Sequence, residues 1–364
     1  MKRPGVLRGL LFALAGAFCA NMKVIGFALW GLCALFVLLR QLLRRQGGGR
    51  VWAAGLAAFF GFIGFYALLT PALWRQPTGF FRYLVENALD FSRWKNYVRF
   101  RGTTFLLGKE RLPWYYLPYM IAATTPLWTL FLCAVGQLGA LKSWKKGLHG
   151  SDRALGLQLC SLLWLLPLGA AGLAHATVYN GWRHFYFLYG PMLVLAAYGL
   201  HGLYRLMEGK PLASRLLTVL LSLCMALTGV GIATQHPYQY AYEQPVVRLL
   251  TGQDDLERDY WNVSVLNALE ALAGRTEGEI VIAPADLWAR VGLENALYVM
   301  EPRLRQRFIP TEGAAEYVLS NPTYALFSGW EPSEEQEEAV TIRAYGRTLM
   351  RIDRDRAWKK EKGE

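Results

Sequence analysis

Charged residues are scarce in this chain of 364 residues: Asp, Glu, Lys and Arg together make up only 18% of it. Soluble domains usually carry about 25%. Hydrophobic residues reach 54% and aromatic residues 14%, which is too much apolar and aromatic mass for a disordered chain. The shortage of charge therefore excludes an ordinary soluble protein, and we expect a large part of the chain to lie in lipid.

Cysteine is also scarce, and the usual signatures of metal and phosphate sites are missing. The five cysteines are odd in number and all fall within apolar runs, and no C-x-x-C pair occurs. This excludes a disulfide scaffold and leaves no zinc pattern. The C-terminal part has neither a Gly-rich phosphate loop nor a nucleophile elbow, and no repeat of fixed period predicts a solenoid.

The charges that are present are unevenly distributed. Residues 1–234 carry a balance of +19, whereas residues 235–364 carry −7. The basic net charge of +12 thus describes a basic membrane region and a mildly acidic tail, not one basic surface. Nucleic-acid binding is therefore a poor interpretation, and we expect a transmembrane region over 1–234 and a soluble external α/β domain over 235–364.

Seven apolar runs are long enough to predict membrane-spanning helices, which need about 20 mostly apolar residues. The runs cover residues 5–22, 24–43, 52–73, 114–137, 154–178, 185–206 and 212–233. The fold class that this predicts is an α-helical polytopic membrane protein of about seven spans with a small C-terminal α/β domain outside the membrane. The first two runs are so close together that they should form either a tight hairpin around Lys23 or one broken pair.

The distribution of Lys and Arg between loops gives an orientation, because cytoplasmic loops are enriched in both. With the N-terminus in the cytoplasm, the cytoplasmic segments carry 14 of these residues and the external segments 10. This small excess favours an integral protein of a bacterial plasma membrane with a cytoplasmic N-terminus and an external C-terminal domain.

Most of the external charge lies in one loop, residues 74–113, which has a balance of +5. Its first part has apolar residues at 80, 81, 84, 85, 88 and 91, a spacing that predicts an amphipathic helix on the membrane surface. Two interpretations stay open: a solvated helix attracted to anionic headgroups, or a binding site for the phosphate of an anionic lipid.

The tail shows the alternation of helices and strands expected for one small α/β domain. We predict helices over 261–272, 285–300 and 312–319, the last with Thr311 as a cap. Strands are predicted over 279–284 and 324–328, and a hairpin over 340–345 and 348–353 turns at residues 346–347.

The strongest candidate site is the aromatic segment 179–187, which joins the fifth and sixth predicted spans on the external side. Arg183 and His184 lie there between two apolar helices, preceded by Tyr179. The planar donors of Arg183, with a hydrogen bond from His184, would suit phosphate oxygens. The alternative is an interfacial aromatic belt with one arginine reaching the surface. Lys23 is either a third cation on the same face or a lysine that simply reaches water.

Four further segments carry weaker signals. Trp114 and Tyr115 belong to a Pro-bracketed aromatic run that is either a membrane anchor or a wall of a lipid-substrate groove. Pro126, a little deeper, frees backbone groups that Thr124 or Thr125 could satisfy. The tyrosines of 236–242 suggest an interfacial girdle. Residues 259–261, Asp-Tyr-Trp, either face a substrate or begin the packing of the tail domain.

Together these segments resemble the polytopic GT-C glycosyltransferases, in particular the group of protein O-mannosyltransferases and aminoarabinose transferases. The resemblance covers roughly residues 5–355. The segments that match in order and spacing are 112–118, 124–126, 179–185, 236–240, 259–261, 316–318 and 342–351. It implies transfer of a sugar from a polyprenyl-phosphate carrier to an acceptor at the external face, in the bilayer, with Arg183, His184, Tyr179, Lys23, Trp114 and Tyr115 around the lipid phosphate.

The resemblance also implies a catalytic carboxylate in an external loop after the first span, and this chain has only Asn21-Met-Lys23 there. The chain thus resembles the C-terminal portion of such an enzyme, from a truncated gene, a split-gene subunit whose partner chain supplies the N-terminal half, or a misplaced start codon. The catalytic residue stays unknown: Glu86 and Asp90, four residues apart, are weak candidates to replace the missing acid, because a solvated helix face is the usual role of such a pair. The need for a divalent metal stays open. The alternative function is a non-catalytic protein that binds a polyprenyl phosphate or assists envelope assembly.

Overall fold

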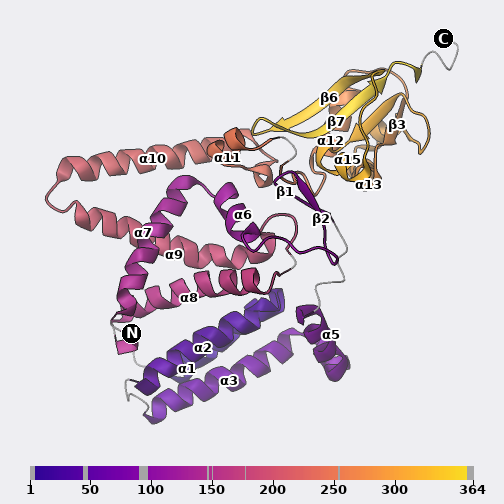
Figure 1. Cartoon of the computed structure of the whole chain (residues 1–364). Coiled ribbons are helices and arrows are strands. Elements are labelled where there is room, and N and C mark those ends of the chain that lie inside the picture. Colours follow the sequence, from indigo (N-terminus) through magenta and orange to yellow (C-terminus); the bar gives the residue numbers. More distant parts are fainter. Residues whose placement is uncertain are drawn as a thin grey trace. The chain divides into compact units, whose positions relative to one another are not determined.

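The computed structural model describes residues 5–43, 48–89, 97–145, 147–149, 151–176, 178–252 and 255–358. The chain is mostly helical, with a small sheet near the C-terminus (Figure 1). It divides into two compact units. The first unit consists of Met1–Trp94, Thr129–Ala174 and Phe185–Lys210, and the second of Lys95–Trp128, His175–His184 and Pro211–Glu364.

Five helical segments in the described part of the chain are long and apolar enough to cross a membrane. They are α2 (Ile25–Leu43), α3 (Gly49–Leu69), α8 (Asp152–Leu173), η3 with α9 (Arg183–Leu206) and α10 (Pro211–Thr234). Most residues of these helices are not buried by other parts of the protein, and in α10 no residue is buried. Such apolar, uncovered helices are what a bilayer would surround.

The other two predicted spans differ from the sequence expectation. Helix α1 (Val6–Met22) has 17 residues, which at 1.5 Å per residue is shorter than the roughly 30 Å of hydrocarbon. The run 114–137 is divided into α6 (Tyr116–Thr124) and α7 (Leu127–Trp144). Pro126 lies at the division, because proline disfavours helical geometry in the residue before it. Seven spans therefore stay a prediction.

In the first unit, α1 packs closely against α3 (Figure 1). The buried face of α1 consists of small residues only: Gly9, Ala13, Gly16, Ala17 and Ala20. Small side chains let two helix backbones approach each other, which is the usual way in which helices pack in membranes. Helix α1 ends at Met22 and α2 begins at Ile25, and the two helices are in contact. This confirms the predicted tight hairpin.

The remaining elements of the first unit are short helices, or helices that follow α7 in the chain. They are α4 (Pro71–Arg75), α5 (Pro77–Leu89), η2 (Gly147–His149) and the helices α8 and α9. Helix α5 confirms the helix predicted from residue 77. Arg40 of α2 is buried and forms an ion pair of 2.5 Å with Asp152 at the start of α8, so a charged contact joins two apolar helices.

In the second unit, a hairpin that the sequence did not predict precedes α6. It pairs β1 (Tyr97–Phe100) with β2 (Thr103–Leu106). The break between α6 and α7 is closed from a distant segment: the Gln244 side-chain amide donates to the carbonyls of Ala122 and Thr125. Thr124 bonds the Met120 carbonyl instead. The expectation that Thr124 or Thr125 satisfies the freed groups is therefore wrong, since glutamine brings two donors that a threonine lacks.

The C-terminal part of the second unit contains a five-stranded mixed sheet. Its order is β4-β3-β5-β7-β6, with β3 parallel to β4 and β5, and β7 antiparallel to β5 and β6. The strands are β3 (Ile280–Pro284), β4 (Phe308–Pro310), β5 (Tyr317–Ser320), β6 (Gln336–Ala344) and β7 (Arg347–Asp355). The helices are η4 (Gln239–Ala241), α11 (Pro245–Leu250), α12 (Ser264–Ala273), α13 (Leu287–Val299), α14 (Pro302–Arg305) and α15 (Pro322–Ser328).

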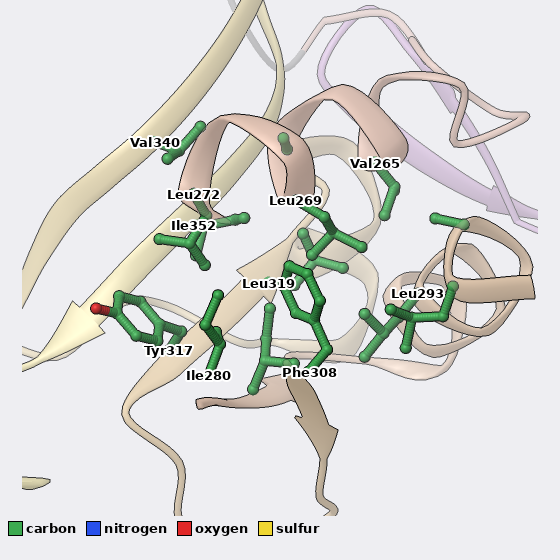
Figure 2. Close-up of a cluster of buried hydrophobic side chains, with 14 of the residues drawn as sticks. Val265, Leu269, Leu272, Ile280, Leu293, Phe308, Tyr317, Leu319, Val340 and Ile352 are labelled. Atoms are coloured by element: carbon green, nitrogen blue, oxygen red, sulfur yellow. The ribbon is translucent and has the colours of Figure 1, made fainter. Parts of the chain in front are cut away.

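Helix α12 covers one face of this sheet. Figure 2 shows its residues Leu269 and Leu272 on the side of Ile280, Leu319 and Ile352 of the strands, and Val265 nearer to helix α13. All six side chains are at most 1% exposed. Each buried aliphatic side chain contributes about 1.5–3 kcal/mol of transfer free energy, so this cluster is a hydrophobic core of the kind that defines a domain.

Two of the predicted elements in the tail are wrong, and each has a local cause. Residues 312–319 do not form a helix: Thr311 bonds the Gly313 backbone within a turn, and Tyr317–Ser320 is the central strand β5. Residues 324–328 belong to helix α15, not to a strand. There Asn321 caps the helix, a proline follows at the first helical position, and Gly329 ends it with φ of 70°, a complete set of helix boundary signals.

Candidate functional site

Arg183 lies among three aromatic rings of the second unit. The carbon centre of its guanidinium is 5.0 Å from the centroid of the Tyr179 ring, 5.6 Å from Tyr260 and 5.7 Å from Trp261. Each of these distances is within the roughly 6 Å over which a ring face attracts a cation. We call Tyr179, Arg183, His184, Tyr260 and Trp261, together with Glu257, the Arg183 cluster.

The segment that carries Arg183 is held by a buried tryptophan and a tight backbone turn. Trp182 is 4% exposed, and its indole N–H donates to the Thr124 hydroxyl over 2.8 Å. Asn180 and Gly181 have φ of 53° and 70°, left-handed values that favour asparagine and glycine. This turn places Tyr179 and His184 edge to face, with ring centroids 4.5 Å apart.

The opposite side of the cluster is held by Asp259, which is fully buried. Its carboxylate accepts hydrogen bonds from the hydroxyls of Tyr240 and Ser264 and from the backbone N–H groups of Val263 and Ser264. The two N–H groups belong to the first turn of α12, which has no partners for them in the helix. Asp259 thus fixes the start of α12 and, immediately before it, Tyr260 and Trp261.

Glu257 supplies a carboxylate close to the Arg183 cation. The Tyr324 hydroxyl donates to its Oε1 over 2.8 Å, whereas its Oε2 is buried and has no hydrogen-bond partner among the described residues. Burial raises the pKa of Glu257 to about 7, while the hydrogen bond from Tyr324 and the charge of Arg183 act in the opposite direction. A carboxyl group of this pKa can hold or release a proton near neutral pH.

The cluster keeps its cation without a direct ion pair. Among the described residues, no carboxylate oxygen lies within 4.0 Å of the Arg183 guanidinium. The neighbouring Arg258 differs: it is buried and bonds Glu243 over 2.7 Å, so that its charge is neutralised within the protein. Arg183 is half-buried and therefore the better donor for an anionic ligand.

The structure brings three of the predicted site residues together: Tyr179, Arg183 and His184 are in mutual contact, with Arg183 Nε 3.4 Å from His184 Nε2. Trp114 and Tyr115 pack against each other, and Tyr115 against Phe100 of β1. These two belong to an aromatic group of the same unit, and no ring contact joins them to Arg183 within the described part of the chain.

The other candidates lie elsewhere. Lys23 is exposed at the C-terminal end of α1, and Glu86 is exposed in α5, both in the first unit. Asp90 lies outside the described residues. Within the described ranges, no group of three or more His, Cys, Asp or Glu side chains is arranged to hold a metal ion.

The tyrosines of 236–242 form no lipid-facing girdle. Tyr238 is buried in a cluster with Ala344 and Leu349, and Tyr242 packs against Tyr345. Tyr240 bonds Asp259. These contacts explain the correction, because the phenol rings find partners on the β6–β7 hairpin. Two residues of this region, Glu257 and Tyr324, were not identified from the sequence, and the structure joins them by a hydrogen bond. The only signal for Tyr324 was its place in an apolar stretch.

Comparison with family models, with curated proteins and with solved structures finds no match to this chain.

Proposed function

We propose that this protein is a membrane glycosyltransferase of the GT-C type, which binds the phosphate of a polyprenyl-phosphate sugar at the external face of the membrane. The observation that carries the proposal is the Arg183 guanidinium, held among three aromatic rings without an ion pair to a described carboxylate. The apolar helices are consistent with a lipid-linked substrate.

The roles of the residues follow from their chemistry. The planar guanidinium of Arg183 would donate two parallel hydrogen bonds to phosphate oxygens. The rings of Tyr179, Tyr260 and Trp261 orient it without neutralising it, because a ring attracts a cation but carries no net charge. In a sugar transfer, the same cation would stabilise the negative charge that develops on the departing lipid phosphate.

The proposal includes an orientation of the chain in the membrane. In the second unit, α10, which is one of the two longest candidate spans, precedes the sheet domain. We propose that α10 crosses the membrane, that the sheet domain is external, and that the N-terminus is cytoplasmic, with seven spans in total.

Binding of farnesyl phosphate to the purified full-length protein in detergent tests the proposal. The wild type should bind saturably, and Arg183→Gln should bind at least about tenfold more weakly, since a hydrogen bond to a charged group contributes about 1.5–3 kcal/mol. Arg183→Lys, which keeps the charge but loses the fork, should lie between them.

The matched control is Arg303→Gln, which removes an exposed guanidinium from α14 and should bind as the wild type does. Farnesol, which lacks the phosphate, should bind weakly to every variant. Equal binding of farnesyl phosphate by the wild type and Arg183→Gln would overturn the assignment of the site. Binding without any sugar transfer from a polyprenyl-phosphate sugar would favour the non-catalytic alternative.

A further inference from the structure

The unpartnered oxygen of Glu257 is the least satisfied polar atom of the Arg183 cluster. The Tyr324 hydroxyl donates to Oε1, and the backbone N–H of Asn180 is also directed at the carboxyl group. Oε2 is buried, and among the described residues no donor lies in hydrogen-bonding geometry to it. A buried carboxylate oxygen that accepts no hydrogen bond costs free energy. The ionised form of Glu257 is therefore disfavoured, because no donor stabilises the charge at Oε2.

The groups that act on Glu257 come from several elements. Tyr324 in α15 donates the hydrogen bond, the backbone N–H of Asn180 faces the carboxylate, and Tyr116 of α6 lies within electrostatic range. The charge of Arg183 in η3 favours the carboxylate. Arg183 is the only cation among these groups, so the ionised form of Glu257 depends on a guanidinium that is also the proposed anion donor.

We propose that Arg183 and Glu257 form one proton-coupled anion site, in which Glu257 takes up a proton when a phosphodiester anion binds Arg183, and its carboxylic acid then donates a hydrogen bond through Oε2 to the bound phosphate. This inference rests on the proposed function. Phosphodiester is the class to which a sugar linked to a polyprenyl phosphate belongs.

The charge balance supports the exchange. Without a ligand, the guanidinium and the carboxylate together carry no net charge. If the anion bound while Glu257 stayed ionised, the partly buried site would hold two negative charges against one positive charge, which is costly away from water. Uptake of one proton from solvent restores neutrality, and it converts the unpartnered acceptor Oε2 into a donor.

The size of the effect follows from the fraction of Glu257 that is protonated before binding. With a pKa of about 7, that fraction rises from about one tenth at pH 8 to about nine tenths at pH 6, so the apparent affinity should rise about tenfold over this range. Methyl farnesyl phosphate is the suitable probe because, as a diester, it lacks the second phosphate ionisation near pH 6.

The experiment measures the dissociation constant of methyl farnesyl phosphate at pH 6, 7 and 8 for the full chain in detergent. The wild type should bind about tenfold more tightly at pH 6 than at pH 8. Glu257→Gln carries a permanent donor of similar shape, so it should bind equally at all three pH values, and at pH 8 more tightly than the wild type. Glu331→Gln, which changes an exposed acid, should keep the wild-type dependence.

Imidazole also gains charge in this pH range, and His184 is the alternative source of a pH effect. A Glu257→Gln protein that keeps the wild-type pH dependence would assign the effect to another group and overturn the inference, as would wild-type affinity that does not change with pH. In both cases, loss of binding in Arg183→Gln would leave the proposed function intact. Absence of binding by the wild type at every pH would overturn the proposed function itself.

Discussion

Residues 257–260 are consecutive in one loop of the second unit, and each makes a different kind of interaction. Glu257 lies within electrostatic range of Arg183, and the next side chain, Arg258, bonds the buried carboxylate of Glu243. Asp259 then caps α12, and Tyr260 returns to the cation. The reversals are possible because Asp259 has a left-handed φ of 46°, a conformation that aspartate tolerates better than most residues. Asp259 thus sets this side of the cluster, as the turn at Asn180 and Gly181 sets the other.

Glu257 should make the folded protein less stable as the pH rises. Burial raises its pKa from about 4.5 in an unfolded chain to about 7 in the folded protein, so the folded state binds more protons between these values. The stabilisation that this proton provides is complete below about pH 4.5 and is lost as the pH rises to about 7, by at most about 3 kcal/mol. Thermal unfolding in detergent, followed by tryptophan fluorescence between pH 5 and 8, measures the loss.

Glu257→Gln is the comparison, because the amide does not titrate. Subtracting its unfolding curve from that of the wild type removes the contribution of groups common to both proteins, including Asp259, whose pKa is also raised by burial. A wild type and a Glu257→Gln protein that lose stability in parallel over this range would show that Glu257 titrates at its ordinary pKa.

Arg183 and Glu257 of the cluster could not be predicted equally well from the sequence. Arg183 could be predicted as a candidate because it is a cation among aromatic residues between two apolar runs. Glu257 could not, because it lies among several neighbouring acids in residues 254–259 that share the same local pattern. What distinguishes it is tertiary: the hydrogen bond from Tyr324, 67 positions later, and the turn at Asn180.

At the scale of elements, the contact between α1 and α3 leaves no room for a side chain at Gly9. A Cβ there would lie 2.3 Å from the carbonyl oxygen of Ala54, and a helix backbone cannot move away without separating the two helices. Gly9→Ala should therefore destabilise the protein by about 1–3 kcal/mol, the usual cost of overpacking, although alanine is the better helix former. The midpoint of thermal unfolding in detergent measures it.

Gly55 in α3 provides the matched control, because a Cβ at this position meets no atom within 4 Å. Gly55→Ala should leave the unfolding midpoint unchanged or raise it, by up to about 1 kcal/mol of helix propensity. If both substitutions raised the midpoint alike, α1 and α3 would not be in backbone contact.

Periodic apolar patterns predicted the long helices and, among the described strands, β3, β6 and β7. They were least informative where contacts with distant residues determine the local structure. The helix predicted over 285–300 and the strand over 279–284 are present as α13 and β3, and the hairpin near residue 346 is confirmed. The break at Pro126 was visible as a proline. Its partner Gln244 was not, because nothing near it in the sequence indicates that its amide bonds the Ala122 and Thr125 carbonyls.

At the scale of the whole molecule, charge and hydropathy separate along the chain. The first 234 residues carry +19, and the five candidate spans found in the described part of the chain all lie there, whereas the rest carries −7 and contains the buried core of the sheet domain. Positive charge near spans favours the cytoplasmic side, and an acidic tail adds little to this preference. Charge and hydropathy thus predict a lipid-embedded N-terminal region and a separate C-terminal domain, to which the proposed topology assigns the external side.

Labelling of single cysteines from outside intact cells tests the orientation. In a protein whose five native cysteines are replaced by alanine, Lys145→Cys places a thiol in the exposed turn after α7, and Ser333→Cys places one in the exposed segment before β6. With a cytoplasmic N-terminus and seven spans, a membrane-impermeant maleimide should label Cys at 333 readily and Cys at 145 only after the cells are opened. The cysteine-free protein measures background, and a permeant maleimide confirms that both thiols react. Labelling of both positions from the same side would contradict the topology, because an odd number of membrane crossings must separate them.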